Sequence, residues 1–128
     1  MRERTRPLSI VSGLAALAAA GVQLMRGFDG LPRIVAQLAH PAQGAMIAIV
    51  WHSLTFAMAV LGAALLASAR ASRPVAKGAA LLSMVILGGA GAITAYMAAS
   101  ALGDPFAFYP VYFLAGAALL SGLAALKA

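Results

Sequence analysis

Long apolar runs alternate with short polar joints along the sequence. Each run is close to or above the length of about 20 residues that a helix needs to cross the hydrocarbon core of a membrane. Charged residues gather at or near the ends of the runs. The runs extend over Leu8–Met25, Ala45–Ala69, Val75–Ala99 and Phe106–Leu126. The pattern predicts an all-α fold, a four-helix transmembrane bundle, formed by one domain over residues 1–128.

Proline and turn-forming residues mark the joints between the runs. Arg6-Pro7 precedes the first run and Arg73-Pro74 the third. Proline fits the first helical turn because its missing N–H needs no partner there. The joint at Leu102–Phe106 combines glycine, aspartate and proline, which favour turns. Because the joints after the second and third runs are short, the helices on either side of each are expected to be antiparallel neighbours.

The stretch between the first two runs has a helical pattern of its own. Its apolar residues follow the spacing of one helix face, and they are Leu31, Ile34, Val35 and Leu38. Pro32 is suited to begin such a helix and the His40-Pro41 junction to end it. The sequence therefore predicts a short interfacial amphipathic helix between the first and second spans. It would lie either on the outer membrane face or over the mouth of the bundle.

The composition favours a membrane protein over a soluble one. Hydrophobic residues make up 63% of the 128 residues and charged residues only 9%. A soluble domain carries about a quarter charged residues, whereas a membrane protein can keep an apolar outer surface because lipid is its solvent. The chain has no cysteine, which excludes disulfides, thiolate metal sites and thiol catalysis.

The net charge of +6 is distributed unevenly between the two sides of the predicted bundle. Arg26 and Arg33 fall on one side, and the other basic residues fall on the opposite side: Arg2, Arg4, Arg6, Arg70, Arg73, Lys77 and Lys127. Lys and Arg mark cytoplasmic loops, so both chain ends are expected in the cytoplasm. Basic residues at the ends of apolar runs indicate lipid headgroups as partners, not nucleic acid. The Ala/Arg-rich composition suggests the bacterial inner membrane.

Small residues fill the predicted helices and indicate close helix contacts. Gly88, Ala92 and Tyr96 share one helix face at four-residue spacing, as do Gly91, Ala95 and Ala99. Another row consists of Gly62, Leu66 and Arg70. The positions of the prolines also allow two helical hairpins repeated in parallel, a layout that some transporters have. Alternatively, the resemblance between the two halves arises by chance, because the composition of the chain is strongly biased.

His52 is an ionisable residue inside an apolar run, in the stretch IVWHSL. It lies about 10 Å along the second helix from Ala45 at the α-helical rise, below the lipid headgroups. Mostly small residues share its face, so the ring is expected to face another helix and not lipid. An ionisable residue at this depth is a functional-site hypothesis by default.

Other polar and aromatic side chains are expected near the depth of His52. The candidates for a ligand or proton site are His52, Thr55, Thr94, Tyr96, Tyr109 and Tyr112, and Gln23 lies near the outer end of the first helix. Histidine changes charge near neutral pH, which favours a proton-linked or ligand-binding site. The alternative is a neutral His52 that ties two helices through Thr94 or Tyr112. Aromatic residues such as Trp51 form either an interfacial belt or a pocket that opens outward.

No sequence pattern supports catalysis, a metal site or a cofactor. The spans contain no paired carboxylates, no phosphate loop and no HExxH motif, so an enzyme is not favoured. The first functional hypothesis is an accessory or assembly subunit that packs against a larger membrane complex and leaves an Ala/Gly face uncovered. The second is a small oligomeric transporter or binder of an apolar or weakly polar solute. There, His52 titrates and a cavity reaches it from outside.

Overall fold

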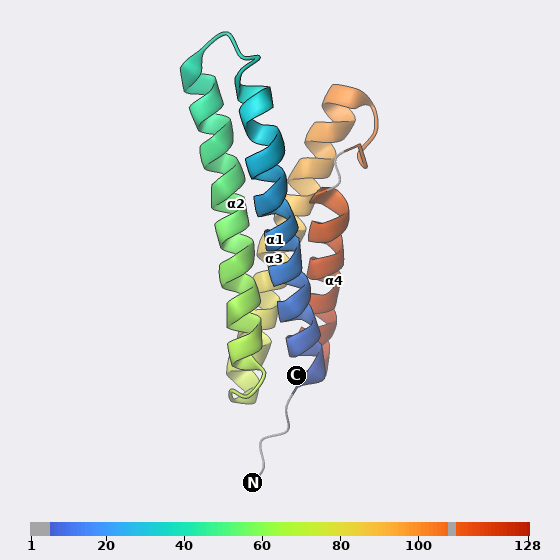
Figure 1. Cartoon of the computed structure of the whole chain (residues 1–128). Coiled ribbons are helices and arrows are strands. Elements are labelled where there is room, and N and C mark those ends of the chain that lie inside the picture. Colours follow the sequence, from blue (N-terminus) through green and yellow to red (C-terminus); the bar gives the residue numbers. More distant parts are fainter. Residues whose placement is uncertain (1–5, 108–109) are drawn as a thin grey trace.

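The chain folds into four long helices that form a bundle (Figure 1). The computed structural model describes residues 6–107 and 110–128. Its helices are α1 (Pro7–Val35), α2 (Pro41–Ser68), α3 (Arg73–Leu102) and α4 (Pro110–Lys127). The first three each carry a proline at one of their first two positions, as the sequence predicts for α1 and α3. Over the described residues the fold is all-α, and the prediction of four apolar helices is confirmed.

The bundle consists of two antiparallel hairpins. Helices α1 and α2 pack along each other, as do α3 and α4, while α1–α4 and α2–α3 form the smaller contacts between the hairpins. The start of α1, the end of α4 and the α2–α3 joint lie at one end of the bundle (Figure 1). This end carries Arg6, Arg73 and Lys127 and is called the basic end below. The predicted antiparallel neighbours α2–α3 and α3–α4 are both in contact.

The predicted interfacial helix is wrong, because its residues are the last turns of α1. Pro32 lies inside α1 and the helix continues to Val35. Proline removes one backbone hydrogen bond there, but packing against α2 holds the segment. Leu31 is buried, and a Cβ atom on Gly44 would lie 2.5 Å from Cγ1 of Val35. The joint to α2 is therefore only residues 36–40.

Glycines let α1 and α2 approach until their backbones touch. A Cβ atom on Gly13 would lie 2.8 Å from the carbonyl oxygen of Gly62, and one on Gly62 would lie 2.9 Å from that of Gly13. Small residues allow this separation, which maximises dispersion contacts between helices in lipid. The predicted contact row is confirmed at Gly62 and Leu66 but not at Arg70, which is exposed. On α3 the contact face is only partly right, because Ala92 and Tyr96 are exposed.

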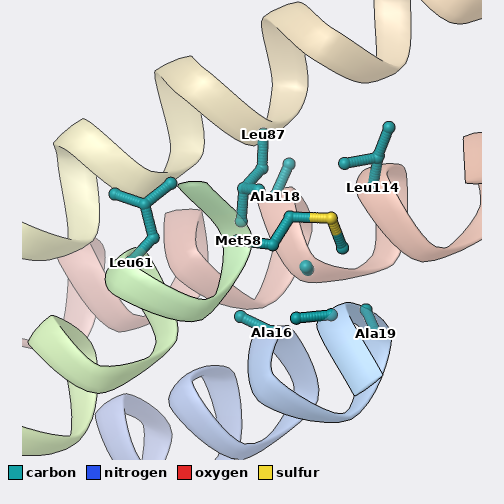
Figure 2. Close-up of a cluster of buried hydrophobic side chains, with 9 residues drawn as sticks. Ala16, Ala19, Met58, Leu61, Leu87, Leu114 and Ala118 are labelled. Atoms are coloured by element: carbon teal, nitrogen blue, oxygen red, sulfur yellow. The ribbon is translucent and has the colours of Figure 1, made fainter. Parts of the chain in front are cut away.

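Small and medium side chains fill the core at the middle and basic end of the bundle. Figure 2 shows Met58 in the centre of the main cluster, between Ala19 of α1 and Ala118 of α4. The cluster consists of Ala16, Ala19, Ala20, Met58, Leu61, Leu87, Leu114, Ala117 and Ala118. A second cluster nearer the basic end consists of Leu65, Ala80, Ala124 and Ala125.

Helix α4 is shorter than the other three, and this leaves the opposite end of the bundle open. It has 18 residues against 28 to 30 in the others, which at the helical rise makes it about 27 Å long. The helix α4 begins at Pro110, after the start of the predicted run at Phe106. The Phe106 N–H donates to Oδ1 of Asp104 at 2.9 Å in a turn before the helix. Away from the basic end, α1, α2 and α3 continue past α4 (Figure 1).

Candidate functional site

A crevice of about 660 Å³ lies between the two hairpins, where α4 is too short to cover α1 and α2. This volume is within the range of about 300–1,000 Å³ that small-molecule sites occupy. All four helices contribute to its wall, which has no charged side chain among the described residues. The lining residues are Gln23, Ile34, Met46, Ile47, Val50, Trp51, Leu54, Thr94 and Pro110.

Gln23 on α1 provides the main polar group of the crevice. The residue is only 3% exposed, and its backbone carbonyl accepts a hydrogen bond from Trp51. Its side-chain amide has no hydrogen-bond partner among the described residues and is not one of the fully enclosed unpaired groups, which are the hydroxyls of Ser12 and Ser83. An amide in an apolar environment normally finds a hydrogen-bond partner, and the crevice is where a partner of the Gln23 amide can lie. Gln23 therefore places an unsatisfied donor and an unsatisfied acceptor in the wall of an otherwise apolar crevice.

Trp51 on α2 is fixed beside Gln23. Its indole Nε1–H donates to the backbone carbonyl oxygen of Gln23 at 2.9 Å. The ring lies over Gly27, where a Cβ atom would come within 2.6 Å of Nε1. The Trp51 carbonyl oxygen in turn accepts a hydrogen bond from Oγ1 of Thr55 at 3.0 Å. The indole is thus a pre-positioned aromatic wall of the crevice, which matches the pocket alternative for this residue.

Thr94 on α3 faces Gln23 from the other hairpin as the second polar residue of the wall. Its Oγ1–H donates to the carbonyl oxygen of Ala90 at 2.8 Å, an ordinary arrangement for threonine inside a helix. Because the hydroxyl proton is used, Oγ1 can offer the crevice only acceptor lone pairs. The crevice therefore combines one complete amide with one acceptor.

His52 lies on the other side of α2, outside the crevice. The expectation that its ring faces another helix and not lipid is only partly right, because the ring contacts Phe28 of α1 but the residue is exposed. It lines a shallow depression with Ile49 and Phe56. These neighbours are 64% and 72% exposed, so this face of α2 points outward. The His52 ring contacts Phe28 of α1, with 6.1 Å between the ring centroids and 49° between the ring planes.

The remaining candidate residues are not gathered around His52. Thr55 is buried and bonded to its own helix. Tyr96 is exposed, as is Tyr112, whose ring stacks on Phe106 at 5.7 Å. Tyr109 lies outside the described residues. Thr94 is the one candidate that lines the crevice among the described residues, and the functional roles of the whole set stay predictions.

The composition of the apolar runs contains a signal for Gln23 and Trp51. Gln23 is the single glutamine within the four apolar runs, and Trp51 is the single tryptophan of the chain. A primary amide at membrane depth is costly unless it is paired, which makes it as informative as an ionisable group. The described residues contain no cluster of three or more His, Asp or Glu that could hold a metal ion.

The variant His52→Gln should keep both its stability and its ligand binding. The ring lies outside the crevice and forms no hydrogen bond within the described part of the chain. We expect the free energy of unfolding to change by no more than about 0.5 kcal/mol, measured by thermal unfolding in detergent micelles. Loss of ligand binding in a folded His52→Gln protein would contradict this expectation and would support His52 as the titrating group of the site.

The four helices are each long and apolar enough to cross a membrane, which is the pattern of a multi-pass helical membrane protein. The crevice between the two hairpins distinguishes it from a uniformly packed bundle. In comparisons with known proteins, no family model, no curated protein and no solved structure matches the chain.

Proposed function

We propose that this chain is a non-enzymatic membrane binder of an apolar small molecule that has one neutral hydrogen-bonding group. The observation that carries the proposal is the buried, unpartnered amide of Gln23 in the wall of the crevice. A ligand whose polar group pairs with this amide removes the cost of leaving it unsatisfied. The apolar part of the ligand lies against Ile47, Val50 and Leu54.

The chemistry of the wall selects the class of ligand. No charged side chain of the described residues lines the crevice, so a charged headgroup has no counter-ion and its desolvation is costly. A carboxamide both donates and accepts, which suits a hydroxyl, a carbonyl or another amide. The fit is therefore to lipid-soluble alcohols, ketones, quinones or amides of moderate size.

The proposed protein is a solute binder, as in the second functional hypothesis, but Gln23 and not His52 provides its polar contact. The accessory-subunit hypothesis has less support, because Gly13 and Gly62, where two helix backbones touch, form a contact inside the chain. It stays an alternative, since Gly78 and Gly89 on α3 have open space around their Cα atoms. Transport and a homo-oligomer would be additions to the binding function.

Fluorescence of Trp51 tests the proposal, because the chain has a single tryptophan and it lines the crevice. Two probes are compared in detergent micelles: a bromododecanol with bromine on the carbon next to the hydroxyl carbon, and the matching bromododecane without the hydroxyl. Bromine quenches indole emission at close range. The alcohol should quench saturably, at a concentration about three- to ten-fold lower than the alkane, which corresponds to one net hydrogen bond.

Two glutamine variants make the assignment specific. Gln23→Leu should remove the advantage of the alcohol, whereas Gln43→Leu should keep it, because Gln43 is exposed at the start of α2. Equal quenching by the alcohol and the alkane in the unmodified protein would contradict the proposal. The same holds if the two variants behave alike.

We also propose that the protein lies in the bacterial inner membrane with its basic end in the cytoplasm. The basic end collects Arg6, Arg70, Arg73, Lys77 and Lys127 among the described residues, which supports this orientation by the positive-inside rule. A reporter fused after Lys127 should read as cytoplasmic, and one inserted at residue 37 as external. The reverse pair of readings would refute the orientation.

A further inference from the structure

A second cavity, of about 510 Å³, lies at the basic end of the bundle and shares no residue with the crevice. The starts of α1 and α3 meet there with the end of α4. Arg6 joins these elements, since its Nη1 donates to the carbonyl oxygen of Ala71 at 2.6 Å. The lining residues are Arg6, Pro7, Leu8, Ser9, Ala71, Ser72, Arg73, Ala124, Lys127 and Ala128.

The electrostatics of this cavity favour an anion. Arg6, Arg73 and Lys127 place three cationic side chains around it. Arg73 also donates to the carbonyl oxygen of Ala128, and each guanidinium keeps further N–H donors for another partner. The N-termini of α1 and α3 border the same space and each adds the positive end of a helix dipole, against one negative end from the C-terminus of α4.

The backbone donors at these two helix starts are not used by side-chain caps. Neither N-cap residue, Arg6 of α1 or Ser72 of α3, forms a side-chain cap hydrogen bond. A helix start normally satisfies its first N–H groups with a cap, water or a ligand. Free backbone donors and cationic side chains therefore face one cavity.

Ser9 is an independent sign that the cavity holds a polar ligand. Its side chain lines the cavity and is only 1% exposed. Its hydroxyl forms no hydrogen bond with the described residues, unlike Ser68 and Ser121, whose hydroxyls donate to carbonyl oxygens of their own helices. The Ser9 hydroxyl is therefore available to the cavity, and an anion there would accept its proton.

We propose that this cavity binds the phosphate group of an anionic phospholipid. The phosphate accepts hydrogen bonds from Ser9 and from the helix starts, and Arg6, Arg73 and Lys127 balance its charge. A lipid is favoured over free phosphate because Pro7, Leu8 and Ala124 give the cavity apolar walls as well. The site also lies at the end of membrane-length helices, where headgroups are found.

Lipid titration of the intact protein followed by native mass spectrometry tests this inference. Phosphatidylglycerol should be retained at a concentration about fivefold lower than phosphatidylcholine, the effect expected for one added ion pair at a membrane surface. Inorganic phosphate at the same concentration should raise the unfolding temperature less than phosphatidylglycerol does. Equal retention of the two lipids, or an equal effect of inorganic phosphate, would overturn the lipid assignment.

Two lysines provide matched variants, because both lie at the basic end but only Lys127 lines the cavity. Lys127→Gln should weaken phosphatidylglycerol binding about fivefold, and Lys77→Gln should leave it unchanged. Ser9→Ala should weaken it about threefold, the effect of one hydrogen bond. Equal losses in the two lysine variants would mean a diffuse surface charge effect and would overturn the site. The comparison of lipids in the unmodified protein stands even if a variant fails to fold.

Discussion

Replacing Gly62 with leucine is expected to prevent α1 and α2 from packing and to leave no cooperatively folded protein. Even an alanine Cβ at this position would lie 2.8 Å from Cγ of Leu17 and 2.9 Å from the carbonyl oxygen of Gly13. The backbone atom cannot move away without separating the two helices. Gly62→Ala should therefore cost about 1–3 kcal/mol, and leucine considerably more.

Thermal unfolding followed by circular dichroism in mild detergent measures this effect, and Gly89 offers the matched control. Gly89 lies within α3, and a Cβ atom added there would have nothing within 4 Å. Both substitutions gain the same intrinsic helix propensity, so the difference between them isolates the steric clash. Similar unfolding temperatures for Gly62→Ala and Gly89→Ala would show that α1 and α2 are not in backbone contact.

Replacing Gln23 with leucine is expected to make the ligand-free protein more stable while it binds its ligand more weakly. Leucine has a similar volume and removes an amide that has no partner among the described residues. The free energy of unfolding should rise by about 0.5–1 kcal/mol, less than the cost of a fully enclosed unsatisfied group, because the amide borders the crevice. Affinity for a hydroxyl-bearing ligand should fall about three- to ten-fold.

Opposite changes in stability and affinity are the signature that separates a binding residue from a structural one. A glutamine that only holds the bundle together would lose stability on replacement. Gln43→Leu is the control for a general effect of added hydrophobicity, because Gln43 is exposed. A Gln23→Leu protein that unfolds at a lower temperature than the unmodified protein would contradict the assignment.

The helices themselves could be predicted from the sequence, because each apolar run was long and its start was marked by proline. The end of α1 could not. Pro32 is as compatible with the start of a new helix as with the interior of a long one, and only the contact of Gly44 with Val35 decides between them. The start of α4 was missed for a similar reason, since Phe106 and Ala107 are apolar but lie in the turn begun by Asp104.

The location of the site was harder to predict, because α2 is apolar on every side. Trp51 and His52 are neighbours in sequence, and the face that turns toward the other hairpin is set by tertiary packing. The crevice side of α2 carries Val50 and Leu54, while the outward side carries Ile49 and Phe56. Neither set differs enough in polarity to reveal its side. A contact with α1, the hydrogen bond from Trp51 to Gln23, fixes the orientation.

The most direct test of the central claim is native mass spectrometry of the protein extracted gently from its own membrane. Three forms are compared: the unmodified chain, Gln43→Leu and Gln23→Leu. The account predicts that the first two retain one neutral small molecule with a hydroxyl, carbonyl or amide group, and that Gln23→Leu retains far less of it. An unmodified protein that carries no such molecule, or equal retention by Gln23→Leu, would contradict the proposal that the crevice binds through Gln23.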